Sequence, residues 1–403
     1  MNTESTVCEE EKRTIQEVFQ KQLFEFKQGM SSKKYRKVLE DIRNKEIHFY
    51  FLDNFWKMRE AKLRCIIKII LRKIDNDGGN YKSTEYWMNK ADKVLEDWQN
   101  KIDINLDNSD IDIKEELEVY IELLFLQLYN HAAVCKGERH IGDSAGFLSL
   151  GIKLISVMIN ENYKMNAKTL YIAQNFYYFT SSILIADKDF STASNYVDIG
   201  LNLCLRELIK ITGGKDFNFK PEDYTKQELY LLDKLLTNFM IGLYQKGVCN
   251  ENLADILPAV NCYSQARWIA DKFKDYFKSL EFGGFVKGVE ERAKSYLSTV
   301  KTLKQILNDV NLKDERNNNK KEKSNMDIFG DKLNQFAGTR EYIEKLKIPE
   351  IEEDENIINN KSKKVKQILS TVKMTFDLMS SNFKNIVEEI KTKKNVESSR
   401  SKK

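Results

Sequence analysis

Residues that break helices and form turns are scarce in this chain. Only 3 prolines and 17 glycines occur among its 403 residues. All-β folds and nucleotide-binding folds with Gly-rich loops need many residues that adopt special backbone angles. The charged fraction of 31% is high and the apolar fraction of 41% is slightly low, a balance that suits thin helical layers better than a thick α/β core. We therefore predict an all-α protein.

The charges of the chain are close to balanced, with 65 basic residues against 61 acidic ones. No global field attracts nucleic acid, so we do not expect a nucleic-acid partner. The six cysteines are far apart and form no C-x-x-C motif, which indicates a reducing compartment. Residues 1–11 are too polar for a secretory signal, and the most apolar window, residues 65–71, is too short to span a membrane. A soluble cytoplasmic protein without a membrane partner is expected.

Residues 1–110 are predicted to form an N-terminal region of three or four helices. Apolar residues recur every three or four positions in residues 9–27, and a long apolar run fills residues 49–71. A further helix is expected to begin at Ser83 or Thr84, after a polar loop. This region contains no motif that we recognise.

From residue 114 onward the apolar pattern indicates pairs of helices joined by short turns. The third pair has six positions spaced 4, 7, 5, 4 and 3 residues apart, namely Leu243, Gly247, Ala254, Ala259, Tyr263 and Ala266. This succession of large, small, turn, small, aromatic and small residues resembles the tetratricopeptide repeat. Small side chains let two helices approach closely, and the aromatic ring fills the space beside them.

The other two pairs follow this frame less completely. In the second pair Ser181 and Ala193 are 12 residues apart, like their counterparts in the third pair, and Gly200 takes the last small position. In the first pair Phe147 and Gly151 stand where a small residue and an aromatic residue are expected. The resemblance covers residues 114–274. A generic antiparallel helical bundle is the alternative, since such bundles also place small residues at close contacts.

The resemblance implies a right-handed superhelical stack of antiparallel helix pairs, an α-solenoid, over residues 111–310. A helix at residues 286–307 is expected to cap its open end. In such stacks the first helices of the pairs line a concave groove that binds a peptide or a helix. The candidate groove residues are Tyr178, Phe179, Ser182, Tyr244 and Gln245. The family's carboxylate clamp is absent from the matching positions, so we expect an apolar or helical ligand, unless these side chains belong to the core.

The C-terminal part begins with a polar linker that includes a short helix, residues 311–361, and ends with a basic disordered tail, residues 395–403. Between them, residues 362–394 are predicted to form an amphipathic helix. Its apolar residues alternate in steps of 4 and 3, a heptad pattern made by Val365, Leu369, Val372, Phe376, Met379, Phe383, Ile386 and Ile390.

Three interpretations of this helix are open. In the first, it forms a coiled coil with a partner or with a second copy of the chain, which would give an oligomer. In the second, it lies in the protein's own groove as a removable lid. In the third, it simply packs on the fold. The basic residues on both sides of it suit an acidic partner surface, although basic tails also serve solubility.

No catalytic, cofactor or metal site is predicted. His48, His131 and His140 lack ligand spacing. Residues 103–114 begin like a calcium loop but lack its glycine and its final glutamate, and Gly213-Gly-Lys215 lacks the first glycine of a phosphate loop.

We therefore expect a non-catalytic scaffold or adaptor that binds protein partners through a groove and a C-terminal helix. The first alternative is a stoichiometric structural subunit of a large cytoskeletal, ciliary or organellar assembly. The second is an all-α enzyme of a kind that leaves no motif.

Overall fold

A computed structural model describes most of the chain from residue 3 to residue 277, several positions between residues 280 and 298, and residues 357–400. Gaps in the first part fall at residues 51, 53, 78–79, 107–113, 162, 164 and 215–219. The described residues form eleven α-helices and two short 3-10 helices, with no strand among them. The prediction of an all-α protein is confirmed.

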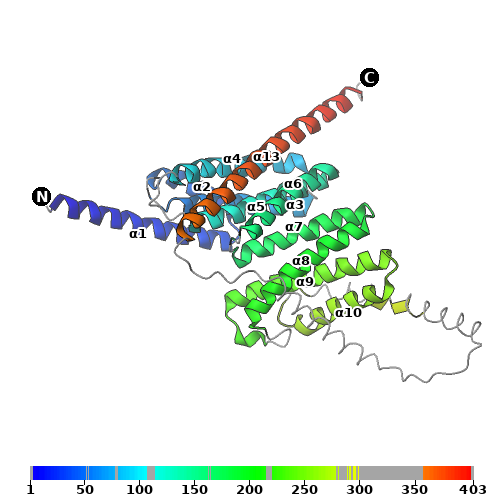
Figure 1. Cartoon of the computed structure of the whole chain (residues 1–403). Coiled ribbons are helices and arrows are strands. Elements are labelled where there is room, and N and C mark those ends of the chain that lie inside the picture. Colours follow the sequence, from blue (N-terminus) through cyan, green and yellow to red (C-terminus); the bar gives the residue numbers. More distant parts are fainter. Residues whose placement is uncertain are drawn as a thin grey trace, which may run out of the picture.

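The N-terminal region contains four α-helices, as expected. They are α1 (Thr3–Ser31), α2 (Tyr35–Lys45), α3 (Trp56–Asp77) and α4 (Tyr81–Leu106), with the 3-10 helix η1 (Glu46–His48) after α2. Helix α1 extends away from the body at its N-terminal end (Figure 1). Helices α3 and α4 pack against each other and both pack on α5, so they continue the arrangement of paired helices.

The three predicted pairs are present as three pairs of long helices. They are α5 (Lys114–Gly137) with α6 (Ile141–Asn160), α7 (Ala167–Ala186) with α8 (Phe190–Thr212), and α9 (Lys226–Asn252) with α10 (Ile256–Phe273); the 3-10 helix η2 (Pro221–Asp223) precedes α9. Within each pair the two helices pack together, and the second helix also packs on the first helix of the next pair. The first helices α3, α5, α7 and α9 contact one another in chain order.

One turn geometry recurs in this part of the chain. It joins α1 to α2 and also joins the two helices of each predicted pair. Each of these four turns contains one residue with positive φ, namely Lys33, Arg139, Lys188 and Ala254. The next residue's amide donates to the carbonyl five residues earlier, with donor–acceptor distances of 2.8–3.0 Å. This is the hydrogen bond of a Schellman motif, which ends a helix and reverses the chain.

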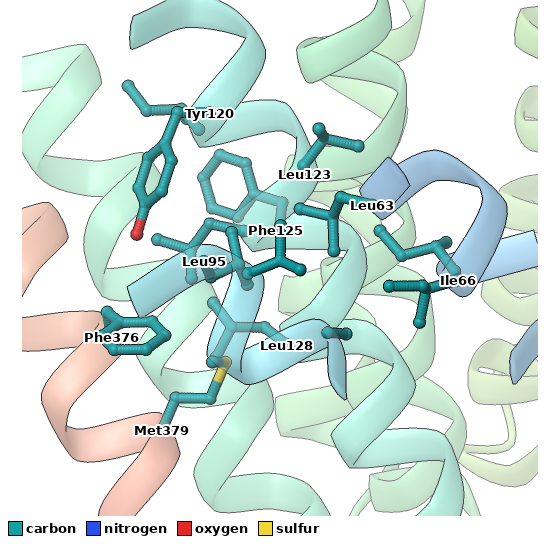
Figure 2. Packing of buried hydrophobic residues seen from close by; sticks show 14 of the residues in the cluster. Leu63, Ile66, Leu95, Tyr120, Leu123, Phe125, Leu128, Phe376 and Met379 are labelled. Carbon is teal, nitrogen blue, oxygen red and sulfur yellow. The ribbon is translucent and has the colours of Figure 1, made fainter. Parts of the chain in front are cut away.

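The largest buried cluster runs from Phe19 in α1 to Ile183 in α7 and includes residues of the C-terminal helix α13 (Ile357–Arg400). Figure 2 shows side chains of α3, α4, α5 and α13 packed together in it. The boundary expected at residue 110 therefore does not separate two cores. A second cluster joins α8, α9 and α10, and a small third one contains Ala259, Val260 and Tyr263.

Helix α13 is longer than the predicted helix at residues 362–394. It includes residues 395–400, which we expected in a disordered tail, because no proline or glycine interrupts the chain there. The described positions within the expected capping helix are helical, and Glu290 accepts hydrogen bonds from Ser264 and Arg267 of α10. The predicted linker up to residue 356, with its short helix, and the last three residues lie outside the described part.

Candidate functional site

The residues predicted to bring helices close together are all buried in the structure. They are Ser181, Ala193, Gly200, Gly247, Ala259, Tyr263 and Ala266. The ring of Tyr263 in α10 lies on Gly247 in α9, where an added Cβ would come within 2.4 Å of the ring atom Cε1. This is the contact of an aromatic residue with a small one that the spacing predicted.

Two further aromatic rings pack on glycines of neighbouring helices. The ring of Tyr178 in α7 lies between Gly200 in α8 and Gly242 in α9, where an added Cβ would come within 2.6 and 2.7 Å of the tyrosine side chain. A Cβ at Gly151 in α6 would come within 2.2 Å of Phe176 in α7. Each contact permits a close approach that no larger residue allows. The sequence frame did not assign this role to Gly151 or Gly242.

The candidate groove residues do not share one environment. Tyr178 is only 4% exposed, and its place between two glycines makes it a core residue, the alternative that the sequence left open. Tyr244 is half-buried and packs on Tyr263, with ring centroids 6.0 Å apart. The amide Nε2 of Gln245 donates to the backbone carbonyl of Tyr178 at 3.1 Å.

The other two candidates, Phe179 and Ser182, lie together with Lys136 at the contact between α5 and α7. The Nζ atom of Lys136 lies 4.9 Å from the centre of the Phe179 ring and 3.4 Å from Oγ of Ser182. Phe179 also packs on Tyr129, with ring centroids 5.1 Å apart. Lys136, Phe179 and Ser182 belong to the first helices of two pairs. With A denoting the first helix of a pair, we call these three residues the A-helix surface.

Helix α13 packs across α4, α5 and α6 (Figure 1). Six of the eight predicted heptad residues have described side chains, and all six are buried: Leu369, Val372, Phe376, Met379, Phe383 and Ile386. The side chains of Val365 and Ile390 lie outside the described part. Ile368, Thr375 and Val387 are buried as well, so the buried face is wider than the narrow seam of a two-stranded coiled coil. We call the residues of α4, α5 and α6 that α13 covers the α13-binding surface.

Phe383 of α13 occupies an aromatic part of this surface. Its ring centre lies 4.1 Å from that of His131 in α5 and 5.9 Å from that of Tyr81 in α4. His131 stacks in turn on Phe147 of α6, at 5.1 Å. Phe147, which did not fit the repeat frame, thus supports the ring beneath α13. Met379, one turn before Phe383 in α13, belongs to the same buried cluster as Leu128 of α5 (Figure 2).

A buried polar cluster lies beside Phe383. Nε2 of His131 is 3.0 Å from Oδ1 of Asp92, and Nε2 of Gln127 donates to the same oxygen at 2.8 Å. In neutral imidazole the nitrogen beside a carboxylate carries the proton, which leaves Nδ1 as an acceptor. Nδ1 of His131 and Oδ1 of Asn130 have no hydrogen-bond partner among the described residues.

Within the described part, no group of three or more His, Cys, Asp or Glu residues is placed to hold a metal ion. Burial raises the pKa of the Cys65 and Cys135 thiols to about 12, and that of Cys249 and Cys262 to about 11. These thiols are therefore protonated at neutral pH, whereas a nucleophilic cysteine needs the thiolate.

Helix α6 has the length and apolar composition that a membrane span requires. Buried helices of proteins without a membrane segment pass the same test, and α6 packs against α5, α7 and α13. The most membrane-like segment of the described chain is thus α6 and not the window at residues 65–71. Its apolar composition matches its contacts with helices on several sides.

Comparison of the chain with protein-family models, with curated proteins and with solved structures found no match.

A bulky residue at a predicted small position tests the repeat frame. Ala259 is fully buried beside Tyr263, and we expect Ala259→Leu to lower the free energy of unfolding by about 1–3 kcal/mol through overpacking. Urea unfolding followed by circular dichroism measures this change. The same substitution at the exposed Ala186 is the control and should change stability little. Equal effects of the two substitutions would mean that the frame is misplaced.

Proposed function

We propose that the protein is a non-catalytic scaffold that binds amphipathic helices of partner proteins. The observation that carries the proposal is α13 itself, since the body already holds an amphipathic helix through a continuous row of buried apolar side chains. Laying the apolar face of a helix onto an apolar surface is a common mode of protein recognition. A partner helix with the same pattern would take the place of α13.

We also propose that the helix pairs form a right-handed superhelical stack like that of tetratricopeptide repeats. Two features support this arrangement. The pairs share one turn geometry, and their first helices contact one another in order. In such a stack the A-helix surface would be a second contact for a peptide or helix. The protonated thiols and balanced charge agree with a protein that binds other proteins in the cytoplasm and catalyses no reaction.

A structural subunit of a large assembly is the second candidate. Helices α1 and α13 both extend beyond the body of the molecule (Figure 1), and projecting helices suit contacts with neighbouring subunits. Basic residues are frequent near both ends of α13, and an acidic partner surface would complement them. A cytoskeletal or ciliary assembly would fit this form.

Binding of a helix in trans tests the scaffold proposal. A fluorescent peptide with the sequence of residues 362–394 is added to the full chain in two variants, and its anisotropy is measured. Val372→Asp is designed to free the α13-binding surface, because it places a charge at a buried position of α13, whereas Leu378→Asp changes the exposed side of the same helix. We expect the peptide to bind the Val372→Asp chain and to bind the Leu378→Asp chain much more weakly. If the freed surface binds no peptide, the proposal fails.

A further inference from the structure

The α13-binding surface is mainly apolar, but it contains one position where α13 fits it poorly. At Phe383 the helix brings a hydrocarbon ring to His131, which is 0% exposed. Nδ1 of His131 accepts no hydrogen bond from any described residue. A buried acceptor without a donor is unfavourable, because it has lost its hydrogen bonds to water and gained nothing in return.

The neighbours of His131 fix which kind of group is missing. Asp92 and Gln127 occupy the Nε2 side of the ring, and Phe147 covers one of its faces. Phe383 lies against the ring from α13, with the two ring planes at 61°. In the tautomer that directs Nε2–H to the carboxylate, Nδ1 is an acceptor, and the group that satisfies it is a donor.

We propose that the partner of the α13-binding surface is an amphipathic helix that carries an aromatic hydrogen-bond donor at the position of Phe383. Tyrosine and tryptophan are the residues of this kind, because each keeps the aromatic contact with His131 and Tyr81 and adds an O–H or N–H group. Such a helix displaces α13, which holds the surface with the same apolar pattern but offers no hydrogen bond to Nδ1 of His131. This inference rests on the proposed function and names the class of partner for the same surface.

The way α13 is attached makes the exchange feasible. More than 80 residues lie between the end of α10 and the start of α13, so α13 is joined to the rest of the protein by a long stretch of sequence. Tethering through a long segment gives a bound helix a limited effective concentration, and a partner with higher affinity for the surface then competes successfully. The tether does not need to be cut for this exchange.

Peptides of residues 362–394 test the inference on the full chain with Val372→Asp. The probes are the native peptide and its Phe383→Tyr and Phe383→Trp variants, whose donors lie at different distances from the backbone. We expect at least one of the two variants to bind about tenfold more tightly than the native peptide, as expected when a buried polar atom gains its partner. A Phe376→Tyr peptide is the matched control, because Phe376 is buried on the same face of α13, seven residues before Phe383, and it should bind no more tightly than the native peptide.

A second measurement tests whether the preference for tyrosine or tryptophan at position 383 depends on His131. Adding His131→Phe to the Val372→Asp chain removes the acceptor, and the tighter binding should then disappear, so that all three peptides bind alike. If the native peptide binds at least as tightly as both donor variants, the surface is built for α13, from the same chain or a second copy, and the inference is wrong. If no peptide binds, the proposed function fails instead.

Discussion

Aspartate in place of Val372 is expected to release α13 from the body of the protein. Val372 is 0% exposed and lies about one helical turn after Ile368, within the buried stretch that ends at Val387. An unpaired carboxylate left in such a place costs about 3–5 kcal/mol, so undocking the helix is the easier outcome. We expect backbone amides of residues 367–387 to exchange hydrogen about 100-fold faster or more, which mass spectrometry measures.

The control for this change is Leu378→Asp, on the side of α13 that faces solvent. Leu378 is 40% exposed, so its replacement should leave the exchange rates close to those of the native protein. In the Val372→Asp variant α6 should also exchange faster, since it loses its cover, while α3 should keep its protection. Loss of protection throughout the body would show that α13 is required for folding and cannot be exchanged.

A methyl group at Gly151 is expected to destabilise the junction between α6 and α7. The added Cβ would lie 2.2–2.8 Å from three atoms of the Phe176 ring, which itself packs on Phe125 at 5.6 Å between ring centroids. The ring has little room to move away, because it is 0% exposed and also packs on Tyr129. We expect Gly151→Ala to lower the free energy of unfolding by about 1–3 kcal/mol, measured by urea denaturation.

Gly146→Ala on the same helix is the matched control. An added Cβ there meets nothing within 4 Å, so alanine should stabilise the helix by about 0.5–1 kcal/mol, because it restricts the unfolded chain. Combining Gly151→Ala with Phe176→Ala should cost less than the sum of the two single changes, since the cavity accepts the methyl group. Additive effects would mean that the two residues do not meet.

In the third helix pair, the residue spacing was sufficient to predict a side-chain contact between the two helices. The spacing from Gly247 to Tyr263 predicted a ring against a small residue, and these two residues do meet. The first pair gave a weaker pattern for a physical reason. Helix α5 is covered by α3, α4, α6, α7 and α13, so its apolar residues are spread over several sides of the helix and no single face stands out.

For α13 the heptad spacing predicted the buried face but not its width. Ile368, Thr375 and Val387 are buried beside the seam because the helix lies across three helices, whereas a two-stranded coiled coil covers a narrower face. The helices that α13 contacts could not be predicted, because an apolar face can pack on many different apolar surfaces. The polar cluster at Asp92 and His131 was missed for the same reason, because its members are 39 residues apart.

The cover that α13 provides has a consequence for the way this chain is made. Helix α6 leaves the ribosome about 200 residues before α13, so at roughly 5–20 residues per second its apolar side stays uncovered for roughly 10–40 s. During this interval the nascent chain exposes an apolar surface that chaperones bind. A message truncated before α13 would make that exposure permanent, and we expect cells to degrade such a product.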